Sequence, residues 1–276
     1  MTERAVPEGK YIDIGNDLTL HYHEAGEGTP VIFVHGSGPG ASGWSNFKGN
    51  YPVMAEAGYR TLIPDLPGYG YSSKPEDAEY TLDFMVAAIE GFVENLGLKN
   101  VILIGNSLGG AICIRFTLNN PKLVQKLVLM APGGLEAREV YMEMEGIQSM
   151  MRSFFSKKGI TKEGMRKTFN LQLFNPALIT DEIIDERYEI ALTQPKTVIS
   201  TMKVPNQSEE VHALSCPILG FWGMDDKFCP PSGAMTLSKA CSNIRFILLS
   251  ECGHWVMVEH GERFNHECIA FFKEGA

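Results

Sequence analysis

The sequence has 276 residues, of which 44% are hydrophobic and 21% are charged, proportions that are typical of a soluble globular protein and argue against disorder. The net charge is −9 and the lysines and arginines are scattered, so we expect no nucleic-acid partner. No run approaches the ~18 apolar residues of a membrane span, and the opening stretch MTERAVPEGK lacks the apolar region of a secretory signal. The sequence therefore predicts a soluble cytoplasmic protein with no membrane partner.

The cysteines are far apart in the sequence and form no CxxC pair or Cys/His cluster with the spacing of metal ligands. Reduced thiols are the expected state in a cytosolic chain. We therefore expect no metal and no cofactor. The six cysteines are Cys113, Cys216, Cys229, Cys241, Cys252 and Cys268.

Short apolar runs alternate with longer amphipathic stretches, which is typical of a mostly parallel sheet covered by helices on both faces. The first two runs are separated by the turn-like Gly15-Asn16-Asp17 and predict an antiparallel opening pair. The eight predicted strands are Lys10–Ile14, Leu18–His23, Val31–Val34, Arg60–Ile63, Val101–Ile104, Leu127–Met130, Ile218–Trp222 and Ile244–Leu249.

Five stretches between these strands have the character of helices: Trp44–Ala57, Leu82–Leu96, Leu108–Asn119, Ser232–Ala240 and Glu262–Lys273. Residues 135–210 contain no strand-like run and show helical periodicity, so they predict an inserted helical lid. Pro176, Pro195 and Pro205 should divide the lid into separate helices. The predicted core then consists of residues 1–134 and 211–276, with an α/β fold built on the mostly parallel sheet.

The strongest local motif is Gly105-Asn106-Ser107-Leu108-Gly109, which matches GxSxG between a predicted strand and a predicted helix. This context is that of the nucleophile elbow of an α/β-hydrolase fold, where a sharp turn exposes the serine hydroxyl, and we predict that fold for the core. In the alternative interpretation, Ser107 only caps the helix. We predict that Ser107 is the nucleophile.

A serine hydroxyl needs a base and a third group that orients the base. His254 lies in the loop between the last predicted strand and the last helix, where the carboxyl edge of the sheet is expected. The acid should come between serine and histidine in this fold, and Asp226 follows the strand ending at Trp222. Asp225 is the alternative acid. Five other histidines fit surface or core positions better: His21, His23, His212, His260 and His266.

The segment His35-Gly36-Ser37-Gly38-Pro39-Gly40 follows the third predicted strand. Gly36 and Gly38 would let backbone amides approach a ligand closely. The amides of Ser37 and Leu108 are the predicted oxyanion hole. A phosphate loop is the alternative, but the segment is neither GxGxxG at a helix start nor a P-loop with its lysine.

With these motifs in view, the whole chain resembles the meta-cleavage product hydrolases, α/β-hydrolases that cut a carbon–carbon bond in vinylogous 1,5-diketones. The resemblance rests on four motifs: HGSGPGASGWSNF (35–47), GNSLGG (105–110), GMDDKFCP (223–230) and GHWVMVEH (253–260). Leu108 stands where methionine is frequent in the family, and Cys229 stands where valine is frequent. Neither change removes a required group.

The resemblance implies further roles for matching residues. Asn46 and Asn106 correspond to an amide pair that holds the dienoate end of the substrate, and Arg187 of the lid matches an arginine that meets the substrate carboxylate. Trp255 is expected beside the site. An arginine among Asp and Glu on a helix is otherwise usually a solvated ion-pair partner, and Trp255 could be purely structural.

The implied activity is hydrolysis of a 2-hydroxy-6-oxohexa-2,4-dienoate-type compound to 2-hydroxypenta-2,4-dienoate and a carboxylic acid. The expected partners are this anionic small molecule and further copies of the chain, in a homodimer or higher homo-oligomer. A carboxylesterase or lactonase with the same triad is the nearest alternative, and a ligand receptor on a hydrolase scaffold is another. Apolar lid residues such as Tyr141 and Met150 suggest an adaptable wall for the ketone substituent.

Overall fold

The computed structural model describes residues 8–275; residues 1–7, which belong to the N-terminal stretch considered above, and Ala276 lie outside the described part. Eight strands form one sheet with the order β1-β2-β4-β3-β5-β6-β7-β8. β1 pairs with β2 and β2 with β4 in antiparallel fashion, and all other neighbours are parallel. This confirms the predicted sheet and its antiparallel opening pair. The strands are β1 (Lys10–Asp13), β2 (Thr19–Ala25), β3 (Thr29–Val34), β4 (Tyr59–Pro64), β5 (Val101–Asn106), β6 (Val124–Met130), β7 (Ile218–Gly223) and β8 (Ile244–Leu249).

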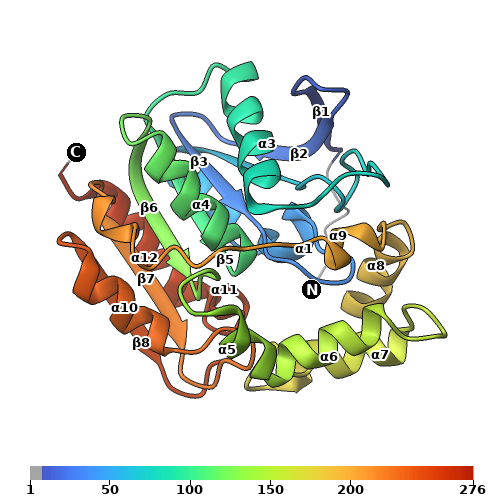
Figure 1. Ribbon diagram of the computed structural model, residues 1–276. Helices are drawn as coiled ribbons and strands as arrows, with labels where there is room; N and C mark the ends of the chain where they lie inside the picture. The colour runs from blue at the N-terminus through green and yellow to red at the C-terminus, as the bar shows by residue number, and fades with distance from the viewer. Residues whose placement is uncertain (1–7, 276) are drawn as a thin grey trace.

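Helices cover both faces of the sheet, as Figure 1 shows. Alternate residues of the buried strand β5 enter two different apolar clusters, with Val101 and Leu103 on one face and Ile102 and Ile104 on the other. The first face is covered by α3 (Leu82–Asn95), α4 (Leu108–Asn119) and α10 (Ser232–Ala240). The second face is covered by α1 (Gly43–Phe47), α2 (Tyr51–Glu56), α11 (Val256–Glu259) and α12 (Gly261–Lys273). No helix within residues 8–275 has both the length and the apolar character required to cross a bilayer.

The predicted single helix Trp44–Ala57 is wrong, because the structure has two short helices, α1 and α2, in its place. α1 is capped at Lys48, Gly49 follows, and Asn50 occupies the N-cap position before α2. The side chain of Asn50 does not cap α2 but donates to the Met257 carbonyl and to Asn265 Oδ1, at 3.1 and 3.0 Å. These tertiary hydrogen bonds fix the break against the C-terminal helices, a contact that local periodicity does not reveal.

The chain between β6 and β7 leaves the sheet and forms a group of helices at one end of it (Figure 1). α6 packs against α7, and α7 packs against α8. Pro176, Pro195 and Pro205 all lie outside α-helices, as expected for residues that lack an amide donor. The elements of this segment are α5 (Arg138–Glu143), α6 (Glu145–Phe154), α7 (Lys162–Phe169), the 3₁₀ turn Pro176–Leu178, α8 (Asp181–Ala191), α9 (Thr197–Ser200) and the 3₁₀ turn Val211–Ala213.

The parallel strands place their carboxyl ends at a common edge of the sheet. β3 ends at Val34, β5 at Asn106, β7 at Gly223 and β8 at Leu249. The loops that leave these ends carry the glycine-rich segment, Ser107, Asp226 and His254 respectively. The topology therefore gathers residues from distant parts of the chain at one site.

Candidate active site

Ser107 occupies a strained turn between β5 and α4. Its backbone has φ 56° and ψ −118°, a conformation that residues with a β-carbon rarely adopt. Its amide donates to the Met130 carbonyl at 3.0 Å, and its own carbonyl accepts from Ala111 and Gly133 at 3.1 and 2.9 Å. This is the geometry of a nucleophile elbow, in which the surrounding hydrogen bonds hold the serine in a strained conformation.

The glycines around Ser107 are required by close packing. A β-carbon on Gly105 would lie 2.4 Å from the Gly109 carbonyl oxygen, and one on Gly109 would lie 2.0 Å from the Val34 carbonyl oxygen. Side chains at these positions would push α4 away from β5 and β3. The two glycines of GxSxG therefore allow the helix that carries the serine to start directly against the sheet.

Asp226 and His254 form a buried hydrogen-bonded pair. Asp226 Oδ2 lies 2.7 Å from His254 Nδ1, and both side chains are almost completely buried. Asp226 Oδ1 accepts from the amides of Phe228 and Cys229 at 2.7 and 2.9 Å, so the carboxylate cannot rotate freely. The Phe228 ring stacks on the imidazole with a centroid distance of 5.1 Å. Asp225, the alternative acid, is partly exposed and donates its amide to the Cys252 carbonyl.

A second buried histidine–carboxylate pair has a structural environment. His21 Nδ1 lies 2.8 Å from Asp65 Oδ2, but Asp65 also accepts the backbone amides of Gly43 and Tyr71. The pair thus anchors the start of α1 to the end of β4. His21 fits the core role expected for it from the sequence.

The loop after β3 offers two free amide donors beside the serine. Ser37 and Leu108 line the same cavity as Ser107, and within residues 8–275 neither of their amides donates a hydrogen bond. Gly36 packs against the serine, since a β-carbon there would lie 3.1 Å from Ser107 Cβ, and Gly38 has φ 143°. The two amides thus have no acceptor among the described residues, and their role as an oxyanion hole stays a prediction from the sequence.

His35 holds this loop in place. Its Nε2 accepts the Leu66 amide at 3.0 Å, so Nδ1 carries the proton and donates to the Gly36 carbonyl at 2.8 Å. The residue is completely buried, and this burial lowers the pKa of His35 to about 4. His35 is therefore neutral at physiological pH and supports the loop through both ring nitrogens.

Arg187 of α8 is buried beside Asn46 and Trp255. One guanidinium nitrogen, Nη2, donates to Asn46 Oδ1 at 2.5 Å, and the guanidinium carbon lies 4.7 Å from the Trp255 ring centre and 5.1 Å from that of Phe169. Arg187 Nε has no partner, and no carboxylate of the described residues pairs with this cation. Burial lowers the pKa of Arg187 to about 10, so the side chain still carries its charge at neutral pH.

Asn106 lies next to the serine but is completely buried. Its Nδ2 donates to the carbonyls of Met130 and His254 at 3.2 and 3.3 Å, whereas its Oδ1 has no partner among the described residues. This oxygen is unpartnered but buried away from the cavity in front of Ser107, while the amide nitrogen supports the loop of His254.

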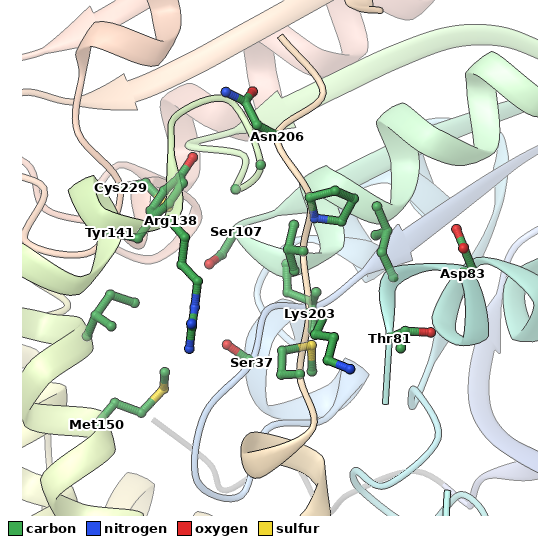
Figure 2. Close-up of a pocket in the computed structure, with 18 of the residues that line it drawn as sticks. Ser37, Thr81, Asp83, Ser107, Arg138, Tyr141, Met150, Lys203, Asn206 and Cys229 are labelled. Atoms are coloured by element: carbon green, nitrogen blue, oxygen red, sulfur yellow. The ribbon is translucent and has the colours of Figure 1, made fainter. Parts of the chain in front are cut away.

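The cavity in front of Ser107 has a volume of about 760 Å³ (Figure 2). Asn46, Asn106, Arg187 and Trp255 do not line it; Asn46 and Trp255 border a separate hollow of about 990 Å³ instead. Of the catalytic, oxyanion-hole and substrate-binding residues predicted from the sequence, only Ser107, Ser37 and Leu108 line this cavity. None of the predicted substrate-binding residues does, and Asn46, Arg187 and Trp255 form a separate buried group. Within residues 8–275, no three His, Cys, Asp or Glu side chains are arranged to hold a metal ion.

Comparison with known proteins gives the family. The alpha/beta hydrolase fold family model matches residues 29–261. A 2-hydroxy-6-oxononadienedioate/2-hydroxy-6-oxononatrienedioate hydrolase of Paraburkholderia phymatum is 32% identical, with 98% of both chains covered. A 2-hydroxy-6-oxo-6-phenylhexa-2,4-dienoate hydrolase of Comamonas testosteroni is 33% identical over 94% of this chain and 93% of its own. The chain belongs to the meta-cleavage product hydrolases of the α/β-hydrolase family.

Solved structures of meta-cleavage product hydrolases have the same architecture. The structure of one from Pseudomonas fluorescens IP01 superposes with a TM-score of 0.86 at 28% identity, covering 97% of this chain and 98% of its own. A serine hydrolase involved in carbazole degradation gives a TM-score of 0.82 at 28% identity, covering 96% of this chain and 98% of its own. The overlap includes the helical segment between β6 and β7, because it extends over almost the whole chain.

Several site residues of this meta-cleavage product hydrolase do not follow from its motifs. The Gln172 carbonyl accepts the amides of His254 and Trp255 at 2.7 and 3.2 Å, and Gln194 Oε1 accepts the Gly40 amide at 2.7 Å. These glutamines lie in the segment with least sequence pattern. The buried Cys229 thiol interacts with the Ser107 side chain, and burial raises the pKa of this thiol well above its ordinary value. In the sequence, only the position of Cys229 in the GMDDKFCP motif could have indicated that this thiol lies near Ser107.

Proposed function

We propose that this enzyme hydrolyses the carbon–carbon bond of a 2-hydroxy-6-oxohexa-2,4-dienoate-type meta-cleavage product, releasing 2-hydroxypenta-2,4-dienoate and a carboxylic acid. The names of the relatives support this substrate class. The observation that carries the proposal is the buried Arg187 without a carboxylate partner. A buried cation is costly unless an anion compensates it, and the planar guanidinium fork suits a carboxylate.

In the proposed binding mode, the side chains between the Ser107 cavity and the buried group around Arg187 move apart. The substrate carboxylate then pairs with Arg187 while the enol hydroxyl donates to the free Oδ1 of Asn106. Asn46 orients the guanidinium through its 2.5 Å hydrogen bond, and Trp255 packs against the cation. Gly36 and Gly38 shape the loop that brings the Ser37 amide to the reacting carbonyl. The dienoate end is thereby held on the Arg187 side of the serine, and the ketone substituent extends into the cavity.

The proposed reaction begins with ketonisation, in which His254 transfers the enol proton to the carbon that later leaves. This step supplies the electron sink without which carbon is a poor leaving group. Ser107, deprotonated by His254 and oriented through Asp226, attacks the distal carbonyl, and the Ser37 and Leu108 amides hold the oxyanion. The carbon–carbon bond breaks, the electron pair returns to the dienol, and water releases the acid. A direct attack of water activated by His254 gives the same products.

A carboxylesterase or lactonase would use the same Ser107, Asp226 and His254. An ester substrate has no obligatory carboxylate, however, and gives no reason for a buried, unpaired Arg187 beside Asn46. A ligand receptor on this scaffold would cleave about one ligand molecule slowly per protein molecule, whereas an enzyme would turn over repeatedly.

The test compares decay of a yellow ring-fission product with release of p-nitrophenol from p-nitrophenyl esters. We expect kcat/KM to be higher for the dienoate. Arg187→Gln should lower kcat/KM for the dienoate by roughly thirtyfold, which corresponds to about 2 kcal/mol for a charge-assisted hydrogen bond. Arg152→Gln, a change on the exposed part of α6, is the matched control. Faster turnover of esters, with Arg187→Gln equal to wild type on the dienoate, would contradict the proposal.

We further propose that residues 135–210 serve as a lid over the site. The cytoplasmic location and the homodimeric or larger assembly stay predictions from the sequence.

A further inference from the structure

The backbone of the loop that carries His254 is held by hydrogen bonds from three directions. The Gln172 carbonyl accepts the His254 amide at 2.7 Å, and Asn106 Nδ2 donates to the His254 carbonyl at 3.3 Å. The amide of Gly253, directly before the base, donates to Glu259 Oε2 at 2.6 Å. Glu259 therefore supplies the acceptor for the peptide group that leads into the catalytic histidine.

The Glu259 carboxylate joins two segments that are distant in the sequence. Glu259 is the last residue of α11 and is half-buried. While Oε2 accepts from Gly253, Oε1 accepts the amide of Asn175 at 2.9 Å, and Asn175 itself caps the 3₁₀ turn Pro176–Leu178. Within residues 8–275, no lysine or arginine pairs with Glu259. Both oxygens are thus committed to backbone amides, one in the loop of His254 and one in the helical segment between β6 and β7.

This loop is packed so closely that a small change at Gly253 would be transmitted to the base. A β-carbon on Gly253 would lie 2.5 Å from the Gln172 carbonyl oxygen, and one on Gly223 at the end of β7 would lie 2.1 Å from the Gly253 carbonyl oxygen. The imidazole is held at Nδ1 by Asp226, so its remaining orientation follows from the backbone. A displacement of about 1 Å at a reacting group can lower a rate by about a hundredfold.

We propose that Glu259 is a positioning residue for His254, which it fixes through the amide of Gly253 and ties to the helical segment through the amide of Asn175. This role rests on the proposed function, because it requires His254 as the base and proton shuttle. Glu259 does not line the cavity in front of Ser107, so it acts on the base and not on the substrate there. Its loss should therefore lower kcat and leave substrate binding unchanged.

The experiment measures kcat and KM for a yellow ring-fission product with Glu259→Gln and Glu259→Ala. Glutamine has nearly the same shape, but its side chain offers one acceptor oxygen and an NH₂ group, so it cannot accept both amides. We expect kcat to fall about tenfold in Glu259→Gln and about a hundredfold in Glu259→Ala, with KM within about threefold of wild type. In a Ser107→Ala background, adding Glu259→Gln should leave the dissociation constant of the substrate unchanged.

Rescue by a small carboxylate tests the carboxylate itself. Glu259 lines the hollow of about 990 Å³ together with Trp255 and Met257, so Glu259→Ala leaves a space that an added anion can reach. Formate should raise kcat of Glu259→Ala several-fold, whereas sodium chloride at the same ionic strength should not. Glu259→Gln, in which the side chain still fills this space, should not respond to formate.

Glu262→Gln is the control variant, because Glu262 lines the same hollow and its side chain makes no hydrogen bond or ion pair within residues 8–275. It should match wild type, and urea denaturation shows that each variant is folded. Wild-type kcat in both Glu259 variants, whatever their stability, would overturn the inference, as would a raised KM with unchanged kcat. A loss of kcat on which formate and chloride act equally would also overturn it. Absence of dienoate turnover by wild type would overturn the proposed function and this inference with it.

Discussion

The carboxylate of Asp226 is fixed on both oxygens, one by His254 and the other by two backbone amides. This arrangement determines which ring nitrogen of His254 carries the proton and leaves the other nitrogen free to act as a base. Asp226→Asn keeps the shape but presents an amide to Nδ1, which favours the wrong tautomer. We expect kcat to fall by about 10⁴, as for comparable triads.

The measurement is the decay rate of the yellow substrate under saturating conditions. Asp225→Asn is the matched control, because it makes the same chemical change one residue earlier, outside the hydrogen bond to His254. It should retain kcat within a few-fold of wild type. Equal losses in the two variants would argue against Asp226 as the partner of the base.

The sequence was sufficient to predict where a residue lies when its position is set by the end of a strand. Ser107, Asp226 and His254 each follow a recognisable apolar run, so their meeting at one edge could be predicted from the topology. The burial of Arg187 could not be predicted from the residues around it, since Asp181-Glu182-Ile183-Ile184-Asp185-Glu186 reads as a solvated helix face. The hydrogen bonds to Gln172 and Gln194 gave no sequence signal at all, because they exist only after the helical segment packs over the sheet.

At the scale of elements, the approach of α4 to the sheet depends on glycine. The β-carbon of an alanine at position 109 would lie 2.0 Å from the Val34 carbonyl oxygen, and a backbone atom cannot move aside as a flexible side chain can. We expect Gly109→Ala to lower the free energy of unfolding by about 3 kcal/mol or more. Urea denaturation followed by circular dichroism measures this change.

Gly49→Ala is the control for this prediction, since a β-carbon there would meet no atom within 4 Å and the φ angle is not positive. Its free energy of unfolding should stay within about 1 kcal/mol of wild type. A similar stability of the two variants would mean that α4 can shift away from β3 without cost.

Strands and helices could be predicted where a single feature of the sequence, such as a continuous apolar run, determines the local structure. The buried strands are continuous apolar runs, and α4 and α10 have the bounds that the sequence predicts. The break between α1 and α2 was not predicted, because it depends on the hydrogen bonds of Asn50 to the distant residues Met257 and Asn265. Tertiary contacts of this kind override local helical periodicity.

For the whole molecule, the buried His35 links folding to pH. Its folded pKa of about 4 lies below its ordinary value of 6.5 because burial disfavours the charged ring. Between these values the unfolded chain binds a proton and the folded chain does not, so stability falls as the pH falls through this window. We expect the free energy of unfolding to be about 2 kcal/mol lower at pH 5 than at pH 7 from this residue alone.

Urea titrations at pH 5 and pH 7 test this expectation. His35→Asn should be less stable than wild type at pH 7 and should show a smaller loss between the two pH values. Burial also lowers the pKa of His23, so part of the pH dependence should remain in the variant. An identical pH dependence in wild type and variant would show that His35 is not the group responsible.

The hydrogen bonds that Gln172 and Gln194 accept from the loops of the core have a consequence for protein engineering. The first holds the backbone on which His254 sits, and the second holds Gly40 in the loop that carries Ser37. The helical segment between β6 and β7 is therefore not an interchangeable cassette. A segment grafted from a relative would have to supply a backbone carbonyl and a side-chain acceptor at these two points. Without them, we expect the graft to change the substrate preference and also to displace His254 and the loop of Ser37.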